Sequence, residues 1–190
     1  MRIHARLKTL GGAGIVAIAT GFSALILWLG YVAFGAWTSL IFSSGFLGGL
    51  LLWWLFPGPP ALAEVRTPYW ITLALFLVHR VEERFSGFFA ALSNLTGAPT
   101  PPILSWPVIL LVLASVGAWL LVLPLLKRGS AFGAYLAWTF FAAMGVTELA
   151  HFVFPFVVDG RLGYFPGMAS VVLLAPVAWW GMFRMARAQC

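Results

Sequence analysis

The chain has 190 residues, of which 62% are hydrophobic and only 8% are charged, and its formal net charge is +6. Soluble domains are about half apolar and about a quarter charged, so this composition excludes an ordinary water-soluble domain and indicates lipid as the solvent. The basic residues sit at the ends of apolar segments, which excludes a contiguous nucleic-acid-binding patch. The single cysteine, Cys190, excludes an intramolecular disulfide and a multi-cysteine metal site.

Six apolar segments follow one another along the chain, each close to the roughly 20 residues that a helix needs to cross the hydrocarbon of a bilayer. They predict an all-α fold, a polytopic membrane bundle of about six helices. Between the third and fourth segments, residues 87–92 are too apolar for a water-exposed loop and predict a short interfacial helix. The six predicted spans are residues 10–33, 39–56, 68–85, 103–126, 131–156 and 165–185.

The basic residues predict the orientation of these spans, because lysine and arginine are enriched in cytoplasmic loops. With the N-terminus inside, eight of the 11 basic residues fall on the cytoplasmic side and three fall outside. We therefore expect both termini to be cytoplasmic, in a multi-pass protein surrounded by membrane lipids. The eight are Arg2, Arg6, Lys8, Arg66, Lys127, Arg128, Arg184 and Arg187, and the three are Arg80, Arg84 and Arg161.

Ionisable residues gather in two short clusters within otherwise apolar surroundings. His79, Glu82 and Glu83 stand at positions i, i+3 and i+4, so their side chains share one face of the third span. Glu148 and His151 stand at i and i+3 and share one face of the fifth span. Both spans run in the same direction and both clusters lie in their outer halves, so the two faces could meet in the bundle core.

The residue types in these clusters favour metal binding. An ionisable side chain at membrane depth costs about 3 kcal/mol or more, so by default it marks a functional site. Glu-x-x-His at i, i+3 occurs in carboxylate-bridged di-metal helical bundles, and imidazole with carboxylate suits zinc, iron or manganese. The candidate metal ligands, which are also the candidate catalytic acids and bases, are His79, Glu82, Glu83, Glu148 and His151.

The leading hypothesis is therefore a metal-binding site, or a metal-dependent enzyme that acts on a lipophilic or membrane-adjacent small molecule. Three alternatives stay open. The same histidines and glutamates could catalyse proton transfer without a metal, as in an isomerase. The chain could be a small cation- or proton-coupled transporter. The charges could also form a purely structural network, with Arg80 paired to Glu83 or Glu148.

Three stretches, taken in order, resemble the HXXEE family of prokaryotic integral membrane proteins. Residues 79–83 read His-Arg-Val-Glu-Glu and fit the motif letter for letter. Residues 148–151 end in a histidine where the family places one in a later helix, and residues 164–167 are similar to its Tyr-x-Pro-Gly start of the last helix. The resemblance implies residence in a prokaryotic cytoplasmic membrane and a shared polar site, without naming a reaction.

The resemblance spans residues 68–185 and leaves the first two predicted spans outside it. It therefore suggests a division of the chain into two parts. Residues 1–67 form an N-terminal two-helix membrane extension, and residues 68–190 form an HXXEE-like four-helix membrane domain.

Overall fold

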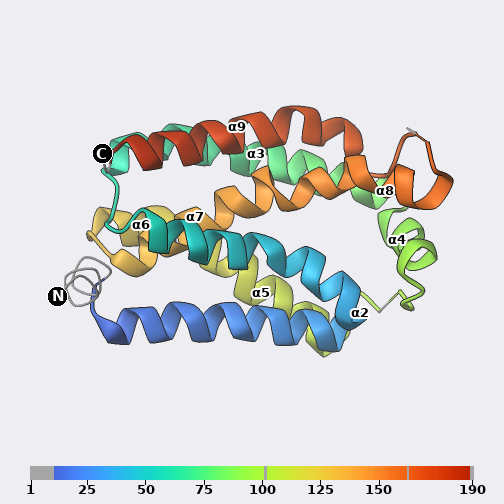
Figure 1. Ribbon diagram of the computed structural model, residues 1–190, viewed down its shortest axis with the longest axis horizontal. Helices are drawn as coiled ribbons and strands as arrows, with labels where there is room; N and C mark the ends of the chain where they lie inside the picture. Colours follow the sequence, from blue (N-terminus) through green and yellow to red (C-terminus); the bar gives the residue numbers. More distant parts are fainter. Residues whose placement is uncertain (1–10, 101, 162, 189–190) are drawn as a thin grey trace.

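The computed structural model describes residues 11–100, 102–161 and 163–188, and within these ranges the chain is helical and contains no β-strand. The predicted all-α class is therefore confirmed. The long helices run roughly along the long axis of an elongated bundle, and α4 and α8 lie at one end of it (Figure 1). The helices are α2 (Ala13–Leu55), α3 (Leu62–Ser86), α4 (Phe88–Thr96), α5 (Trp106–Leu120), α6 (Val122–Lys127), α7 (Ala131–Gly145), the 3-10 helix η1 (Thr147–Leu149), α8 (Ala150–Asp159) and α9 (Met168–Arg187).

Helix α2 consists of two halves that fold back on each other at Gly35 (Figure 1). Gly35 has φ 79° and ψ 179°, a conformation that a residue with a Cβ rarely adopts. Across the hairpin, the Ser39 hydroxyl donates a hydrogen bond of 2.7 Å to the carbonyl of Leu27. The first two predicted spans correspond to these two halves.

Among the residues that the structure describes, four helical stretches are long and apolar enough to cross a membrane: Ala13–Leu55, Trp106–Lys127, Ala131–Val157 and Met168–Arg187. Because the first of them contains the α2 hairpin, these four stretches overlap five of the six predicted spans. The remaining predicted span, residues 68–85, is helical as part of α3, which carries several charged side chains. The count of six spans and the cytoplasmic termini stay predictions, and Arg2, Arg6 and Lys8, on which the orientation partly depends, lie outside the described residues.

Helix α7 forms the centre of the bundle and is buried from Gly133 to Gly145. It packs against both α2 and α9. A Cβ atom added at Gly45 or Gly49 of α2 would overlap the backbone of α7 at Ala143 or Thr139, so these glycines allow the two helices to touch.

The predicted continuous fifth span, residues 131–156, is interrupted, and this corrects the expectation of one helix there. Helix α7 ends at Gly145, where the Trp179 indole Nε1 of α9 donates a 2.5 Å hydrogen bond to the Gly145 carbonyl. The amide of Leu149 bonds instead to the carbonyl of Val146, which is the tighter 3-10 pattern. This break turns the chain at η1 and places Glu148 in the bundle interior.

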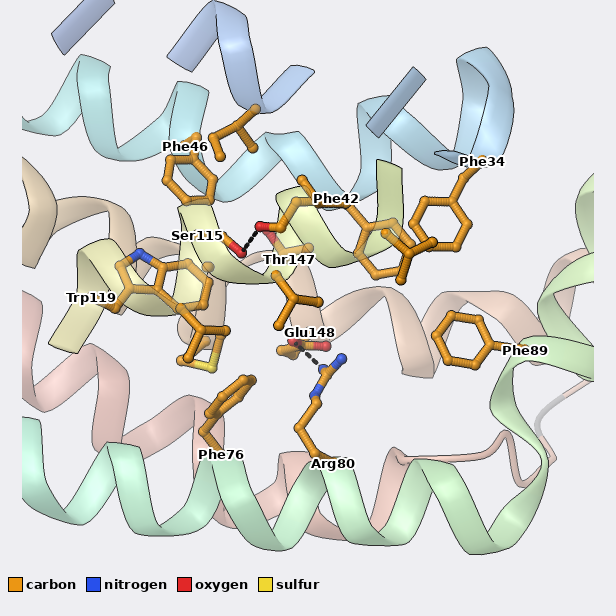
Figure 2. A pocket seen from close by; sticks show the side chains of 17 residues that line it. Phe34, Phe42, Phe46, Phe76, Arg80, Phe89, Ser115, Trp119, Thr147 and Glu148 are labelled. Carbon is orange, nitrogen blue, oxygen red and sulfur yellow. Dashed lines mark hydrogen bonds and ion pairs between the residues drawn. The ribbon is translucent and has the colours of Figure 1, made fainter. Parts of the chain in front are cut away.

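A cavity of about 280 Å³ lies between α2, α3, α5 and α7 (Figure 2). Its wall is mostly aromatic and aliphatic, and it includes Arg80 of α3 and Glu148 of η1. The interior of the bundle therefore combines an apolar space with charged side chains at its edge.

Candidate metal centre

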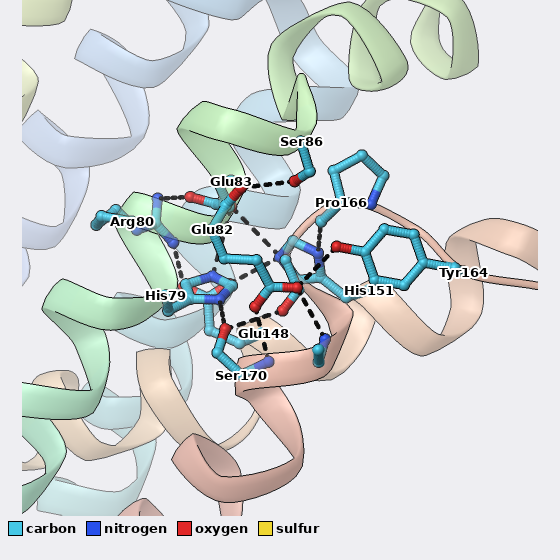
Figure 3. A network of polar contacts seen from close by, with 12 residues as sticks. His79, Arg80, Glu82, Glu83, Ser86, Glu148, His151, Tyr164, Pro166 and Ser170 are labelled. Atoms are coloured by element: carbon cyan, nitrogen blue, oxygen red, sulfur yellow. Dashed lines mark hydrogen bonds and ion pairs between the residues drawn. The ribbon is translucent and has the colours of Figure 1, made fainter.

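Three elements bring four of the five predicted site residues together (Figure 3). His79 and Glu83 project from successive turns of α3, Glu148 comes from η1, and His151 comes from the first turn of α8. All four are buried, with between 0% and 8% of their surface exposed. Each offers one ligand atom, and these four atoms lie within 4.8 Å of one another.

Four of the six distances among these atoms fit a metal site. Nε2 of His79 lies 3.4 Å from Oε1 of Glu83 and 3.2 Å from Oε2 of Glu148. Nε2 of His151 lies at the same two distances from the same two oxygens. A tetrahedral ion with ligands at about 2.0–2.2 Å separates neighbouring ligand atoms by about 3.3–3.6 Å. The four atoms could therefore bind one ion with little rearrangement.

The other nitrogen of each imidazole is fixed by a partner near the start of α9. Nδ1 of His151 lies 2.6 Å from the carbonyl oxygen of Pro166, which can only accept, so Nδ1 carries a proton. Nδ1 of His79 lies 2.8 Å from the Ser170 hydroxyl, and that hydroxyl donates its own proton to the Gly167 carbonyl at 3.1 Å. When either ring is neutral, its lone pair is therefore on Nε2, as in histidine ligands of metals.

Arg80 forms ion pairs with the two carboxylates through the oxygens that do not face the histidines. Its Nη1 lies 2.8 Å from Oε2 of Glu83 and its Nη2 lies 2.9 Å from Oε1 of Glu148. The ion pairs of the structural alternative are thus present. They leave the second oxygen of each carboxylate facing Nε2 of both histidines, and Glu83 Oε1, 3.4 Å from each of these nitrogens, makes no hydrogen bond among the described residues. A buried carboxylate oxygen that makes no hydrogen bond, next to three other potential metal-ligand atoms, fits a metal site better than an ion-pair network alone.

Glu82, the fifth predicted site residue, points away from the other four and binds the start of α9. Its Oε1 accepts hydrogen bonds from the Tyr164 hydroxyl at 2.8 Å and from the Ala169 amide at 3.0 Å, and its Oε2 accepts one from the Ser170 amide at 2.7 Å. Burial and the contact with the Glu82 carboxylate raise the pKa of the Tyr164 phenol, which keeps it a donor. Glu82 therefore satisfies free amides at a helix N-terminus and holds Ser170 against His79.

Gly167 lies directly behind both imidazoles of the site, and no sequence pattern marked it as a site residue. Its φ is +93°, and a Cβ atom there would lie 2.6 Å from Cε1 of His151 and 2.9 Å from Cε1 of His79. A glycine is therefore needed for the chain to pass behind both imidazoles. The 164–167 stretch was noted only as a resemblance, and Ser170 gave no signal in the sequence because a lone serine in an apolar helix is common.

Comparison with known proteins gives one match. A family model described as "Protein of unknown function with HXXEE motif" matches residues 70–181, more than half of the chain. The matched stretch contains all five predicted site residues as well as Arg80, Gly167 and Ser170. No curated protein and no solved structure matches the chain.

Proposed function

This chain belongs to the family of proteins of unknown function with the HXXEE motif, and we propose that it is a metal-dependent membrane enzyme. Its centre is a divalent ion bound by His79, Glu83, Glu148 and His151. The observation that carries this proposal is the convergence of four buried ligand atoms, with the four histidine–carboxylate distances at 3.2–3.4 Å. The substrate is a lipophilic or membrane-adjacent small molecule, because the space next to the site is apolar.

The donor set favours zinc, with iron or manganese as the other candidates. Zinc accepts imidazole and carboxylate ligands in a tetrahedral arrangement and expands to five ligands during catalysis. A bound ion of this kind acts as a Lewis acid on a substrate oxygen. Arg80 would keep the two carboxylates in place through their outer oxygens, and Pro166 and Ser170 would keep both imidazoles turned toward the ion.

The test is the metal content of protein purified without a polyhistidine tag and without chelators, measured by mass spectrometry. We expect about one ion per chain in the wild type and little in Glu83→Gln. The matched control is Glu64→Gln, which removes a carboxylate that pairs with Arg184 outside the cluster. Wild-type protein that carries no more metal than Glu83→Gln, even after incubation with zinc, iron or manganese, would overturn the proposal.

A second candidate function, proton transfer without a metal, is favoured by one contact. Oε2 of Glu148 lies 3.2 Å from Nε2 of both histidines, which is within hydrogen-bond distance if either nitrogen carries a proton. This arrangement could move a proton between a carboxylate and an imidazole. Chelation separates the two functions, because the metal-free reaction survives it and the metal-dependent reaction does not.

A further inference from the structure

The cavity described above ends at the candidate metal centre. Glu148 contributes one oxygen to the cluster of four ligand atoms and also belongs to the cavity wall, as does Arg80, which binds it. Figure 2 shows the Arg80 side chain reaching from α3 toward Glu148, with aromatic rings around the space. The aromatic residues of the wall are Phe34, Phe42, Phe46, Phe76, Phe89 and Trp119.

The polar groups of the wall differ in whether they are free to bind a ligand. The Thr147 hydroxyl is paired with Ser44 at 2.8 Å, and the Ser115 hydroxyl donates to the Leu111 carbonyl at 2.6 Å. Arg80 is different, because a guanidinium has five N–H donors and its two ion pairs engage Nη1 and Nη2 once each. Its side chain is 34% exposed, so donors remain for an oxygen atom that enters the cavity.

The volume indicates how much of an occupant this partly open cavity can hold. A cavity of roughly 150 Å³ holds benzene, and pockets for drug-sized ligands start near 300 Å³. At about 280 Å³, this cavity suits a molecule of roughly ten to twelve non-hydrogen atoms. The apolar wall requires that nearly all of these atoms are carbon.

The charges set the polar end of the occupant. A divalent ion and the Arg80 guanidinium together carry three positive charges, against two negative charges on Glu83 and Glu148, and the neutral histidines add none. One positive charge is left over at the edge of an apolar space, where an unbalanced charge is costly. A ligand carboxylate would balance it and could form two parallel hydrogen bonds with a guanidinium.

We propose that this cavity is the binding site for a medium-chain carboxylate. Its hydrocarbon part packs against the six aromatic rings, and its carboxylate faces Arg80 next to Glu148. This inference deepens the proposed function by naming the substrate class, and its charge balance rests on the proposed metal ion.

The test measures binding of radiolabelled decanoate to the full chain in lipid nanodiscs, with binding to empty nanodiscs subtracted. Ser115→Phe places a ring in the cavity without touching a ligand of the metal centre, and we expect it to weaken decanoate binding at least tenfold. Leu113→Phe is the matched control, because Leu113 lies on the same helix, is 64% exposed and is not part of the wall. It should bind decanoate as the wild type does.

Two further measurements separate the failure of this inference from the failure of the proposed function. Decane, which has the chain but no carboxylate, should compete at least tenfold less well than unlabelled decanoate. Metal content is measured in the same samples. Metal-loaded protein in which Ser115→Phe binds decanoate like the wild type, or in which decane competes as well as decanoate, would overturn the inference. Absence of metal from all samples would instead contradict the proposed function.

Discussion

The imidazole rings of His79 and His151 lie edge to face, with centroids 5.0 Å apart and planes at 87°. They come from helices far apart in the sequence, yet each ring is fixed at Nδ1 and directs Nε2 toward the same two carboxylate oxygens. The ring of His151 also packs against Phe88 at 5.1 Å between centroids. The side chains of the centre are therefore held in place by surrounding contacts, and a metal ion would enter a site that is already formed.

Replacing Gly167 by alanine should disrupt the metal centre. The added Cβ would overlap both imidazoles, and the positive φ disfavours any residue with a Cβ. We expect zinc affinity to fall roughly tenfold or more, as for loss of a group that orients a metal ligand. Isothermal titration with zinc checks this, with circular dichroism to show that the helices persist. Gly163→Ala is the control, because its nearest atom would lie 3.9 Å away. Equal affinity of the two variants would contradict the role of Gly167.

Removing the Ser170 hydroxyl should weaken metal binding through His79. The Ser170→Ala variant leaves Nδ1 of His79 without the acceptor that places its lone pair on Nε2. Loss of such an outer partner typically reduces metal affinity roughly 10–100-fold. Ser93→Ala removes a hydroxyl of α4 that donates to the Ala98 carbonyl, away from the site, and should have no effect on affinity. If Ser170→Ala binds zinc as tightly as Ser93→Ala, the proposed orientation of His79 is wrong.

Glu82→Gln should destabilise the protein while it still binds one metal ion. The carboxylate accepts hydrogen bonds from two amides at the start of α9, where a negative charge is stabilising. Because this side chain is partly exposed, we expect the free energy of unfolding to fall by only about 1 kcal/mol. Thermal unfolding in detergent measures the change, and mass spectrometry measures the metal. A metal-free Glu82→Gln protein would contradict this expectation.

Arg80→Gln should destabilise the metal-free protein more than the metal-loaded protein. Without a metal, the guanidinium is the main positive charge near the two buried carboxylates, so its loss leaves them unbalanced and costs roughly 2 kcal/mol. With a divalent ion in place, the positive charge of the ion still balances the two carboxylates in part. Unfolding of both forms measures the difference, and Arg184→Gln, which breaks the pair with Glu64, should show no dependence on metal.

Gly49→Ala should lower stability by pushing α2 away from α7. Its Cβ would overlap the Thr139 backbone, and overpacking of this kind costs about 1–3 kcal/mol. Gly21→Ala, in the first half of α2, meets no atom within 4 Å and should be neutral or slightly stabilising. Thermal unfolding of the two variants gives the comparison. Equal stability would mean that the contact between α2 and α7 is looser than the structure shows.

The positions of the helices could largely be predicted from the sequence, because long apolar segments have few other conformations in lipid. Two breaks in the helices were not part of the prediction. The end of α7 depends on the indole of Trp179, which lies in α9 and donates a hydrogen bond to the Gly145 carbonyl. The break between α5 and α6 follows from Pro124, which has no amide to bond to the Leu120 carbonyl. The second could have been predicted from the proline, whereas the first is a tertiary contact that no local pattern indicates.

The candidate site could be predicted in part. Helical spacing placed His79 and Glu83 on one face, and the same rule placed Glu82 there too. Positions i+3 and i+4 diverge enough that Glu82 contacts α9 while Glu83 contacts the cluster. Which neighbour each side chain meets depends on the packing of α9, which the spacing within α3 does not define. The role of Gly167 could not be predicted either, because it depends on the close approach of this backbone segment to the two imidazole rings.

One helix end decides which tautomer both histidines adopt. Pro166 lies just before α9 and Ser170 lies in its first turn, and they bind Nδ1 of His151 and Nδ1 of His79. The Glu82 carboxylate accepts hydrogen bonds from the first amides of the same helix. A shift of α9 by a single residue would replace these acceptors by other groups, and the hydrogen bonds at Nδ1 of both histidines would be lost together. Both imidazole ligands would then change their affinity for a cation together. The register of α9 therefore controls the cation affinity of the whole centre.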